Sequence, residues 1–380
     1  MDAPTENTRE ARYPKWAAAL ADPEAFQQEQ ARLGRIWTFL GLTFDVAKDG
    51  DWFTAQLGGR SVFVQRFGDG LKGFENRCAH RFYPLRTKDR GNGPIKCGFH
   101  SWEYDEQGRA CQIPRCKELF GTGPLKVNAR IAPIEVATCG SLVFGRFQHP
   151  HDNQTLAEFL GEAVPIIEAM ATIARRPRAL ELDINANWKL CYHISLDDYH
   201  SPSVHPTTFG VAGYIPLRAL RYFRLGAAGA HNAFFPGADE NALQDMIEAC
   251  RNGTYRPVRY RIFQIFPNLL IALFRARQYW FVNVQQYVPV AHDRSHLRAW
   301  YYPAPFDMGH GPVRRLVDKV TEPARTRVIE HYVRKVHAED NEVIERLQRF
   351  ASQQGGWPRL GLAEERIKWF EETYARAMAD

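Results

Sequence analysis

Four side chains of the kind that bind metals stand close together in the first third of the sequence. Cys78-Ala79-His80 is followed, after sixteen residues, by Cys97-Gly98-Phe99-His100. Each segment offers one thiolate and one imidazole, so each can reach both irons of a 2Fe–2S cluster whose irons are held by two Cys and by two His. In such a cluster Cys78 and Cys97 bind one iron, and His80 and His100 bind the other.

A Cys₂His₂ zinc site is the alternative interpretation, because it uses the same residue types. Zinc sites more often pair Cys with Cys and His with His along the chain. Here each pair is mixed, and a single residue, Ala79, separates the first two ligands. The spacing therefore favours the iron–sulfur cluster.

A second group of candidate ligands follows about 100 residues later, in Asp197-Asp198-Tyr199-His200-Ser201-Pro202-Ser203-Val204-His205. A non-haem ferrous site that activates dioxygen requires two His and one carboxylate, and leaves the other coordination positions open. His200 and His205 would provide half of that site. Two His at this spacing are also common at helix ends and on surfaces, so the pair by itself leaves the assignment open.

The periodicity of residues 321–350, which predict a long helix, points to Asp340 as the third ligand. Asp340 stands four residues after Val336 and four before Ile344, on the apolar stripe that also contains Val333, Val343 and Leu347. Glu339 borders this stripe and Glu342 lies off it. A buried carboxylate needs a metal or a cation. The alternative is an Asp340 that pairs with a buried Arg.

The surrounding pattern predicts an α+β protein. We expect a helix over 23–39 capped by Asp22, a β-rich segment over 42–147, a helix near 155–171, strands near 179–191 and 257–302, and helices after 312. The predicted domains are a helical segment over 1–40 that packs on the catalytic domain, an all-β cluster domain over 41–150, and a catalytic domain over 151–380 with a large antiparallel sheet flanked by helices.

Composition limits the functional classes. The 380 residues are 45% hydrophobic, and no run of about eighteen apolar residues predicts a membrane span. The N-terminus lacks the apolar core of a secretory signal, so we expect a soluble cytoplasmic protein. Seven Cys are too few for a disulfide scaffold. The net charge is +6, but the sequence contains no nucleic-acid-binding motif, so the charge does not indicate a nucleic-acid partner.

Part of the positive charge is concentrated around the two cluster loops. We expect this positive rim to steer an acidic electron donor; its residues are Arg77, Arg81, Arg86, Lys88, Arg90 and Lys96. The sequence contains no dinucleotide-binding fingerprint and no flavin motif. Electrons must therefore come from a separate NAD(P)H-dependent reductase, with or without a ferredoxin.

The segment from Cys78 to Tyr104, which ends in HSWEYD, resembles the Rieske motif. It lacks the extra Cys pair of the respiratory Rieske proteins, because Tyr83 and Phe99 occupy the matching positions. The second segment, with Asp ahead of Tyr-His and a second His, resembles the mononuclear iron motif of Rieske non-haem iron oxygenases. The likeness extends to NWKL at 187–190 and to the C-terminal helix. One departure is His193-Ile194, where many members have Glu-Asn.

This resemblance implies an aromatic-ring-hydroxylating α (terminal oxygenase) subunit, acting as a dioxygenase or monooxygenase. Its cofactors would be a Rieske 2Fe–2S cluster and one Fe(II) bound by His200, His205 and Asp340, with dioxygen as co-substrate. Asp197 would orient His200 from behind and bridge toward His100 of a neighbouring subunit, within a head-to-tail homotrimer. The alternative is an Asp197 that only caps a helix.

The substrate is predicted to be a small aromatic compound, with an aromatic acid favoured. Candidate pocket residues are Phe209, Tyr214, Phe234, Phe263, Phe266 and Phe274. Candidate clamps for a carboxylate or sulfonate are Arg218, Arg221, Arg259, Arg275 and Arg277. The alternatives are an oxidative N- or O-demethylase, a quaternary-amine monooxygenase, and, from another class, a Rieske electron carrier without oxygenase activity.

Overall fold

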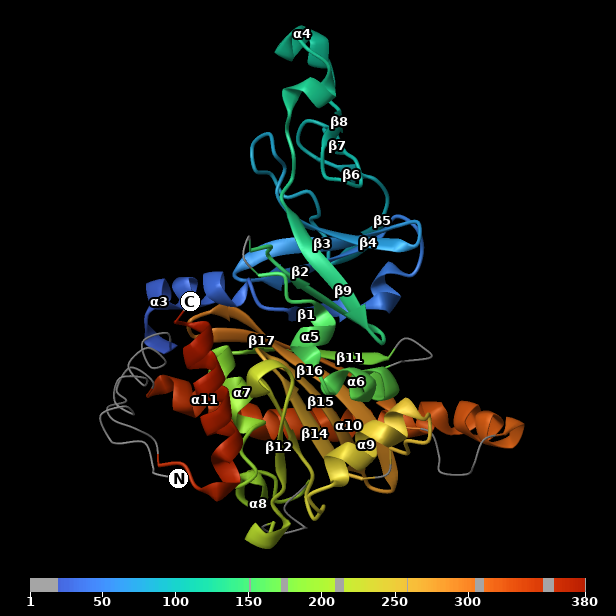
Figure 1. The fold of residues 1–380 in the computed structure, drawn as a ribbon, viewed down its shortest axis with the longest axis vertical. Coiled ribbons are helices and arrows are strands. Elements are labelled where there is room, and N and C mark those ends of the chain that lie inside the picture. Colours follow the sequence, from blue (N-terminus) through green and yellow to red (C-terminus); the bar gives the residue numbers. More distant parts are fainter. Residues whose placement is uncertain are drawn as a thin grey trace. The chain divides into compact units, whose positions relative to one another are not determined.

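The computed structural model describes residues 20–149, 152–171, 177–208, 215–257, 259–304, 311–350 and 359–379 (Figure 1). The contacts divide the chain into two compact units. One unit is Gln30–Leu156, and the other combines the described residues of Met1–Glu29 and Ala157–Asp380. The four candidate cluster ligands lie in the first unit, and His200, His205 and Asp340 lie in the second.

The first unit is built on a seven-stranded antiparallel sheet. Its strands in spatial order are β1 (Thr38–Leu42), β10 (Leu142–Arg146), β9 (Pro133–Cys139), β4 (Gly70–Glu75), β3 (Arg60–Phe67), β2 (Asp51–Leu57) and β5 (Arg90–Asn92). Successive residues of a strand point to opposite faces of the sheet. Val62 and Val64 of β3 enter one apolar cluster, and Phe63 enters another that includes Cys78 and Cys97. Strand β3 thus contributes to two apolar clusters, one of which contains the two candidate cysteine ligands.

A small three-stranded sheet presents the second cluster loop. Its elements and their neighbours are β6 (Ile95–Lys96), β7 (Glu103–Tyr104), β8 (Ala110–Gln112), α4 (Cys116–Phe120) and the 3₁₀ segments η1 (Thr43–Val46) and η2 (Pro124–Val127). Cys97 and His100 lie in the turn between β6 and β7, whereas Cys78 and His80 lie in the loop after β4.

The second unit contains another seven-stranded sheet, in which every pair of neighbours is antiparallel. Its order is β11 (Arg178–Ile184), β17 (Arg294–Pro303), β16 (Tyr279–Ala291), β15 (Leu269–Ala276), β14 (Arg261–Ile265), β13 (His231–Phe234) and β12 (Tyr222–Leu225). The helical segments around it are α5 (Leu156–Leu160), α6 (Ala163–Ala171), α7 (Trp188–Ile194), α8 (Ser201–Val204), η4 (Leu217–Ala219), η5 (Ala227–Gly229), α9 (Ala242–Arg251), α10 (Pro312–Arg349), η7 (Leu362–Glu364) and α11 (Glu365–Ala377). The predicted α+β class, with an antiparallel sheet flanked by helices, is confirmed.

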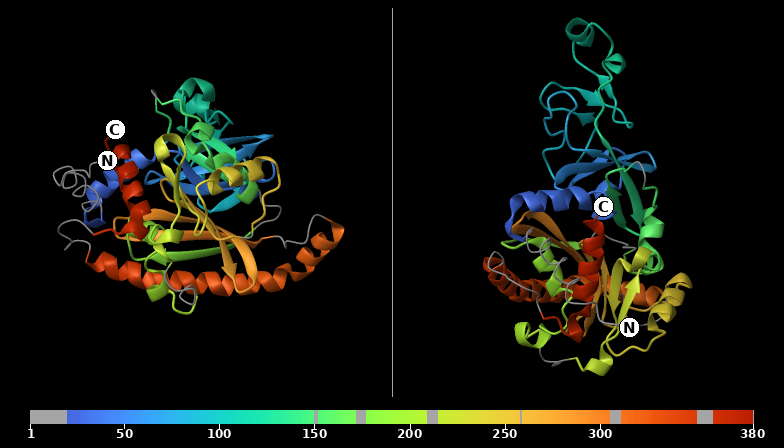
Figure 2. Two further views of the ribbon diagram at one scale, coloured as in Figure 1. Left: turned by 60° about the horizontal axis from the view of Figure 1, so that its bottom comes forward. Right: turned by 60° about the vertical axis from the view of Figure 1, so that its left-hand side comes forward.

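Helix α10 runs along the sheet and turns one face toward it (Figure 2). Val333, His337, Asp340 and Ile344 are buried at spacings of three and four residues, as an amphipathic helix requires. The predicted position of Asp340 on the buried stripe is therefore confirmed, although Leu347 is 46% exposed. Among the helices that the structure describes, none combines the length and apolar character needed to cross a bilayer.

The helix predicted over 23–39 is shorter than expected. Asp22 does cap it, because its Oδ1 accepts the backbone N–H of Glu24 at 2.8 Å. However, α3 (Pro23–Leu33) ends before Gly34, and β1 begins at Thr38. A Cβ atom on Gly34 would lie 3.0 Å from the Cα of Gly58. The close approach of these two glycines stops the helix and turns the chain into the sheet.

Two further element predictions need correction. The strand predicted over 179–191 ends at Ile184, and α7 follows because the Asn187 side chain accepts the backbone N–H of Lys189 at 3.0 Å, a helix N-cap. The apolar residues after Asn187 form a buried helix and not a strand. The helix predicted near 155–171 is two helices, separated at Gly161, whose φ of 52° breaks the helical path.

Glu29 of α3 belongs to the second unit and is buried there. Its carboxylate accepts the indole N–H of Trp188 at 2.8 Å, and it also contacts the Lys189 ammonium and the Tyr374 hydroxyl. Residues 1–19 lie outside the described residues, so the packing of the whole segment 1–40 on the catalytic domain stays a prediction.

Candidate active site

His200 and His205 stand at the two ends of the one-turn helix α8. His200 is its N-cap residue and His205 its C-cap residue, and Pro202 in the first turn fits a helix start. This single turn brings the Nε2 atoms of the two imidazoles to 3.3 Å from each other. The spacing of five residues therefore places both rings on one side of the segment.

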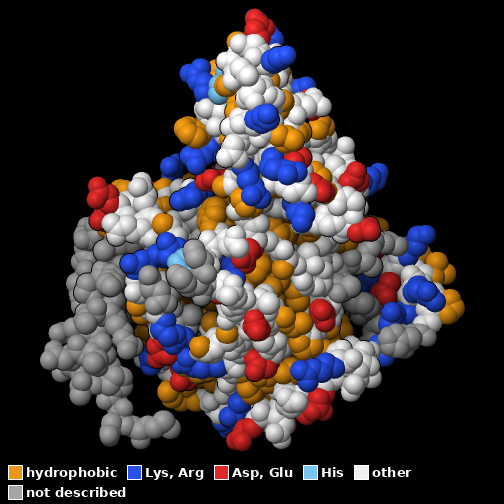
Figure 3. Space-filling model, turned by 45° about the horizontal axis from the view of Figure 1, so that its top comes forward, with side chains coloured by type: hydrophobic (Ala, Val, Ile, Leu, Met, Phe, Trp, Pro, Cys, Tyr) orange, Lys and Arg blue, Asp and Glu red, His pale blue; other side chains and the backbone are white. Residues whose placement is uncertain are grey.

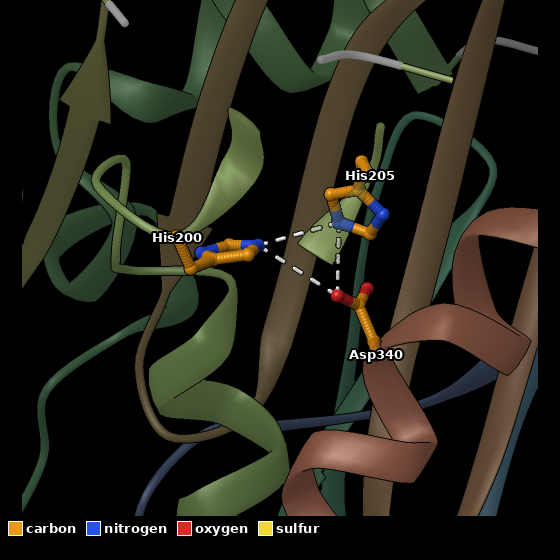
Figure 4. A group of neighbouring side chains, drawn as sticks. All are labelled: His200, His205 and Asp340. Carbon is orange, nitrogen blue, oxygen red and sulfur yellow. Dashed lines mark hydrogen bonds and ion pairs between the residues drawn. The ribbon is translucent and has the colours of Figure 1, made fainter. Parts of the chain in front are cut away.

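Asp340 reaches the same point from α10 (Figure 4). Its Oδ1 lies 3.0 Å from the Nε2 of His205 and 3.7 Å from the Nε2 of His200. Within the described part of the chain, these three residues are the group of metal-ligating side chains whose ligand atoms all lie within 4.8 Å of one another. The Oδ1 atom is buried and lacks a hydrogen bond of proper geometry. A buried oxygen that faces two ring nitrogens in this way fits a metal ion, and two His with one carboxylate fit Fe(II).

The other nitrogen of His205 is held by Glu339. Its Nδ1 lies 2.8 Å from the Glu339 Oε2, and the hydroxyls of Thr208 and Thr207 donate to the same carboxylate at 2.9 and 3.2 Å. Burial lowers the pKa of His205, but the carboxylates of Asp340 and Glu339 outweigh this effect and raise it. Sequence reasoning placed Glu339 only at the border of the buried stripe. The signal that the sequence did offer was the position of Glu339, immediately before the predicted ligand Asp340.

Asp197 caps the turn, which was one of the two predicted alternatives, whereas its orienting role stays a prediction because the His200 Nδ1 makes no hydrogen bond. Its Oδ1 accepts the backbone N–H groups of Tyr199 and His200 at 2.6 and 3.2 Å, which caps the start of the turn. Its Oδ2 lies 3.4 Å from the Nδ1 of His200. Asp198, by contrast, points to a buried Arg366 at 2.7 Å. Burial raises the pKa of Asp198 to about 6, while the charge of Arg366 opposes this shift.

The two cluster loops of the first unit have the same backbone pattern. In each, the N–H of the Cys donates to the carbonyl five residues later, at 2.9 Å for Cys78 and 2.8 Å for Cys97. In each, the residue four after the Cys donates back to the Cys carbonyl and has a positive φ, at Phe82 and Ser101. This repeated turn explains why each loop offers its Cys and its His in a similar way.

The four side chains separate into a thiol pair and an imidazole pair. Cys78 and Cys97 are each 1% exposed. Burial raises the pKa of Cys78, and the neighbouring Cys97 thiol raises it further. The rings of His80 and His100 are 4.7 Å apart, nearer the surface than the thiols. His80 also stacks on Trp102, and its buried Nδ1 has no hydrogen-bond partner.

Positive side chains surround these loops (Figure 3). The exposed ones are Arg77, Arg81, Lys88, Arg90 and Lys96. Arg86 does not belong to this rim. It is 8% exposed, stacks on Trp52, and donates to the Pro94 carbonyl at 3.0 Å. The sequence cannot show that one Arg of the six supports the loop from inside.

A cavity lies beside the His200–His205–Asp340 group, and all three residues line it. Its aromatic lining is Tyr260, Phe274, Phe281 and Tyr332. Of the four predicted pocket residues that the structure describes, only Phe274 is found there. Phe234, Phe263 and Phe266 pack elsewhere in the core, against Tyr222, Phe235 and Phe370. Phe209 and Tyr214 lie outside the described residues.

The predicted arginine clamp is not found in this cavity. None of Arg218, Arg221, Arg259, Arg275 and Arg277 is among its described lining residues. Arg221 donates to the Ala238 carbonyl at 3.2 Å, and Arg275 stacks on Trp280. The remaining three are exposed. Ile194, at the position where the sequence departs from the Glu-Asn pair, does line the cavity, whereas His193 forms an ion pair with Glu371 at 2.9 Å.

Comparisons with known proteins agree with this architecture. Residues 36–129 match the Rieske [2Fe-2S] domain, and residues 172–380 match the ring hydroxylating alpha subunit (catalytic domain). Chlorobenzene dioxygenase subunit alpha from Cupriavidus sp. (strain PS12) is 29% identical over 245 residues, which are 59% of this chain and 54% of that relative. The chain thus spans about half the length of this curated relative.

Solved structures share the fold of nearly the whole chain. Naphthalene 1,2-dioxygenase from Rhodococcus sp., solved with indole, has a TM-score of 0.73 at 20% identity, over 98% of both chains. A quaternary ammonium Rieske monooxygenase, solved with an inhibitor, has a TM-score of 0.71 at 17% identity, over 95% of this chain and 94% of that one. At such low identity these likenesses show the fold.

Both family matches agree with the cofactors that the sequence predicted, a Rieske 2Fe–2S cluster and one mononuclear iron. The donor sets described above have the chemistry that these cofactors require. The chain belongs to the ring-hydroxylating α-subunit family, with a Rieske [2Fe-2S] domain ahead of its catalytic domain.

Proposed function

We propose that this chain is the terminal oxygenase component of a multicomponent Rieske system. It would hydroxylate a small aromatic substrate, once or at two adjacent carbons, with dioxygen and with electrons from a separate reductase. The observation that carries this proposal is the convergence of His200, His205 and Asp340 beside a cavity with aromatic walls. A Rieske electron carrier without oxygenase activity has no use for such a site.

In this proposal His200, His205 and Asp340 hold the mononuclear iron, and two imidazoles with one carboxylate leave coordination positions open on the cavity side. The bound iron would supply the activation of dioxygen. The chain's own part is to orient the ligands. Glu339 keeps the Nδ1 proton of His205 in place, so that the Nε2 lone pair faces the metal. The Asp197 carboxylate lies on the Nδ1 side of the His200 ring, as the Glu339 carboxylate does for His205.

Cys78 and Cys97 would hold one iron of the cluster, and His80 and His100 the other. A single zinc ion would need all four ligand atoms within about 4 Å of one another. In the described part of the chain, only His200, His205 and Asp340 form so tight a group. The separation of the thiol pair from the imidazole pair therefore favours the two-iron cluster.

Electrons would enter through the exposed side of the cluster. The exposed positive rim suits an acidic reductase domain or ferredoxin. We further propose a head-to-tail homotrimer, in which Asp197 bridges toward His100 of the partner subunit. Asp197 lines the cavity and its carboxylate is about one-fifth exposed, so it is accessible from outside the site.

A second candidate is a monooxygenase that hydroxylates or demethylates a quaternary amine. It is favoured by one observation: the described cavity lining contains aromatic rings and carboxylates but no Lys or Arg. Rings and negative charge attract quaternary ammonium groups. This candidate uses the same iron centres and differs in the substrate alone.

Substrate-dependent oxygen uptake tests the proposed function. The purified holoprotein is given NADH and a surrogate ferredoxin reductase, and is screened with aromatic compounds and methylated amines. We expect uptake that is coupled to a hydroxylated product, and release of formaldehyde would identify the demethylase. Uptake without any hydroxylated product, or no uptake across both classes of compound, would contradict the proposal.

A further inference from the structure

Two residues that line the cavity and are not candidate iron ligands each have a buried polar atom without a hydrogen-bond partner. The Oδ1 of Asn283, on β16, and the Nδ1 of His337, on α10, are both in this state. The two residues are 2% and 4% exposed, and both line the cavity. A buried polar atom without a partner is costly, so native proteins almost always satisfy it. These atoms therefore point to a ligand that carries a hydrogen-bonding group.

Asn283 is held in place by its strand and by its neighbours. Phe281, Asn283 and Gln285 alternate along β16 and all three line the cavity, as residues on one face of a strand must. The Asn283 amide nitrogen donates to the Gln285 side chain at 2.7 Å, and Gln285 in turn donates to the Tyr287 hydroxyl at 3.2 Å. These bonds engage the amide nitrogen of Asn283 and leave its oxygen without a partner.

Both groups are electrically neutral. Burial lowers the pKa of His337 to about 4, which leaves a neutral imidazole at ordinary pH. No Lys or Arg is among the described residues of the lining. The lining carboxylates are Asp197, Asp198 and Asp340. The described lining therefore offers no side-chain cation that could pair with a substrate carboxylate.

The rest of the wall is made of rings. The centroid of Phe274 lies 5.5 Å from that of Tyr260 and 5.8 Å from that of Phe281, and the Phe281 ring lies 6.0 Å from that of Tyr332. Such a row of tilted and edge-on rings packs well against a planar apolar molecule. The polar atoms of Asn283 and His337 then act on one substituent of that molecule.

We propose that the substrate is an uncharged ring compound with a hydroxyl or amino substituent, which hydrogen-bonds to Asn283 and His337. This inference rests on the proposed function and narrows its substrate class. It replaces the predicted aromatic acid, because the arginines expected to clamp a carboxylate lie elsewhere. A quaternary ammonium ion fits the rings and the carboxylates, but it has no N–H or O–H to satisfy the two buried atoms.

Binding to the anaerobic holoprotein, measured by calorimetry, separates these classes without turnover. The probes are matched in ring: phenol, benzoate and phenyltrimethylammonium, and the corresponding 2-naphthyl compounds. We expect the hydroxylated member of at least one ring size to bind about tenfold or more tightly than its carboxylate and its ammonium counterparts. Tighter binding of a carboxylate or an ammonium, equal binding of all three, or binding of none would overturn the inference.

Variants of Asn283 test the residue itself. Asn283→Leu should weaken binding of the hydroxylated ring about tenfold. Asn283→Asp, which keeps an acceptor oxygen but loses the N–H that bonds to Gln285, should weaken it less. Gln286→Leu removes a buried amide on the same strand that is not among the described lining residues, and it should leave the affinity unchanged. Cluster absorption and iron content confirm that each variant is folded. If both Asn283 variants bind like the wild type, the inference is wrong.

The binding test and the test of function can fail separately. If the hydroxylated ring binds as expected but yields no coupled oxygen uptake or product, the inference stands and the proposed oxygenase function fails. If a carboxylate or an ammonium binds best and is turned over, the oxygenase function stands and the inference fails.

Discussion

The Nδ1 of His205 lies 2.8 Å from the Oε2 of Glu339, the residue that immediately precedes Asp340 on α10. One stretch of helix thus approaches the candidate iron site from two sides. Asp340 faces the Nε2 of His205, and Glu339 faces the opposite edge of the same ring. This pairing fixes which nitrogen of His205 is available to a metal.

Glu339→Gln should therefore weaken iron binding at the mononuclear site by roughly 10- to 100-fold, because the charged partner of the ligand is lost. The measurement is a titration of iron-depleted protein with Fe(II), followed by the iron content after gel filtration. Glu342→Gln is the matched control, since Glu342 is an exposed residue of the same helix that pairs with Arg346. An unchanged iron affinity in Glu339→Gln would show that the bond to His205 is incidental.

His205→Ala should abolish oxygen uptake and leave the visible absorption of the cluster unchanged. The side chain belongs to the second unit, and no cluster ligand does. The variant should lose about one iron per chain and keep the acid-labile sulfide. Turnover that survives in this variant would mean that the mononuclear site has been assigned wrongly.

Asp197→Asn separates the two roles of Asp197. The Asn side chain can still accept the backbone N–H groups of Tyr199 and His200, so the cap and the thermal stability should be kept. The negative charge behind His200 is lost. We expect kcat to fall at least about tenfold, with normal iron and sulfide contents. A kcat close to that of the wild type would show that Asp197 only caps the turn and plays no part in catalysis.

Tyr104 is expected to tune the cluster. Its hydroxyl lies 3.0 Å from the Cys78 Sγ and accepts the Ala79 N–H at 3.0 Å. Burial raises the pKa of this phenol, which keeps it protonated as a donor. Hydrogen bonds to cluster sulfur raise the reduction potential. Tyr104→Phe should lower the potential by roughly 40 mV, which corresponds to a hydrogen bond of about 1 kcal/mol in a one-electron couple.

The control for this variant is Tyr83→Phe, which removes the hydroxyl of another tyrosine. Tyr83 lies in a loop, and its ring packs on Phe99. Redox titration followed by electron paramagnetic resonance measures both. Equal potentials for Tyr104→Phe and the wild type would contradict the role of this hydroxyl.

The pair formed by Asp198 and Arg366 should matter for stability. Arg366 is fully buried, and it bonds to Asp198 and to the side chain of Gln264. Arg366→Met would leave the carboxylate of Asp198 buried without its partner. The expected loss is about 3–5 kcal/mol of unfolding free energy, measured by urea denaturation. A loss below about 1 kcal/mol would show that the pair is replaceable.

Much of the architecture follows from local signals in the sequence. The mixed Cys–His pairs predicted the cluster, and the 3.6-residue period placed Asp340 on the buried face of its helix. These predictions succeed because they depend on spacing within one element. The alternation of β-branched and aromatic residues likewise predicted most strands of the two sheets, but not β12 and β13.

The failures concern contacts between distant segments. The run after Asn187 is buried on almost every side, Lys189 included, so its apolar residues have no period that distinguishes a buried helix from a strand. The end of α3 depends on Gly58, which is far along the chain from Gly34. Whether an Arg is exposed, or supports a loop as Arg86 does, is decided by the tertiary fold. For the same reason the sequence could not show that the described residues of the cavity lining include no Lys or Arg.

The central claim is that one polypeptide builds two separate iron centres. The most direct test is the iron and acid-labile sulfide content of anaerobically prepared wild-type protein and its His205→Ala variant. We predict about three irons and two sulfides per wild-type chain, and about two irons with unchanged sulfide in the variant. A wild-type value near two irons after reconstitution, or zinc without sulfide, would contradict this account.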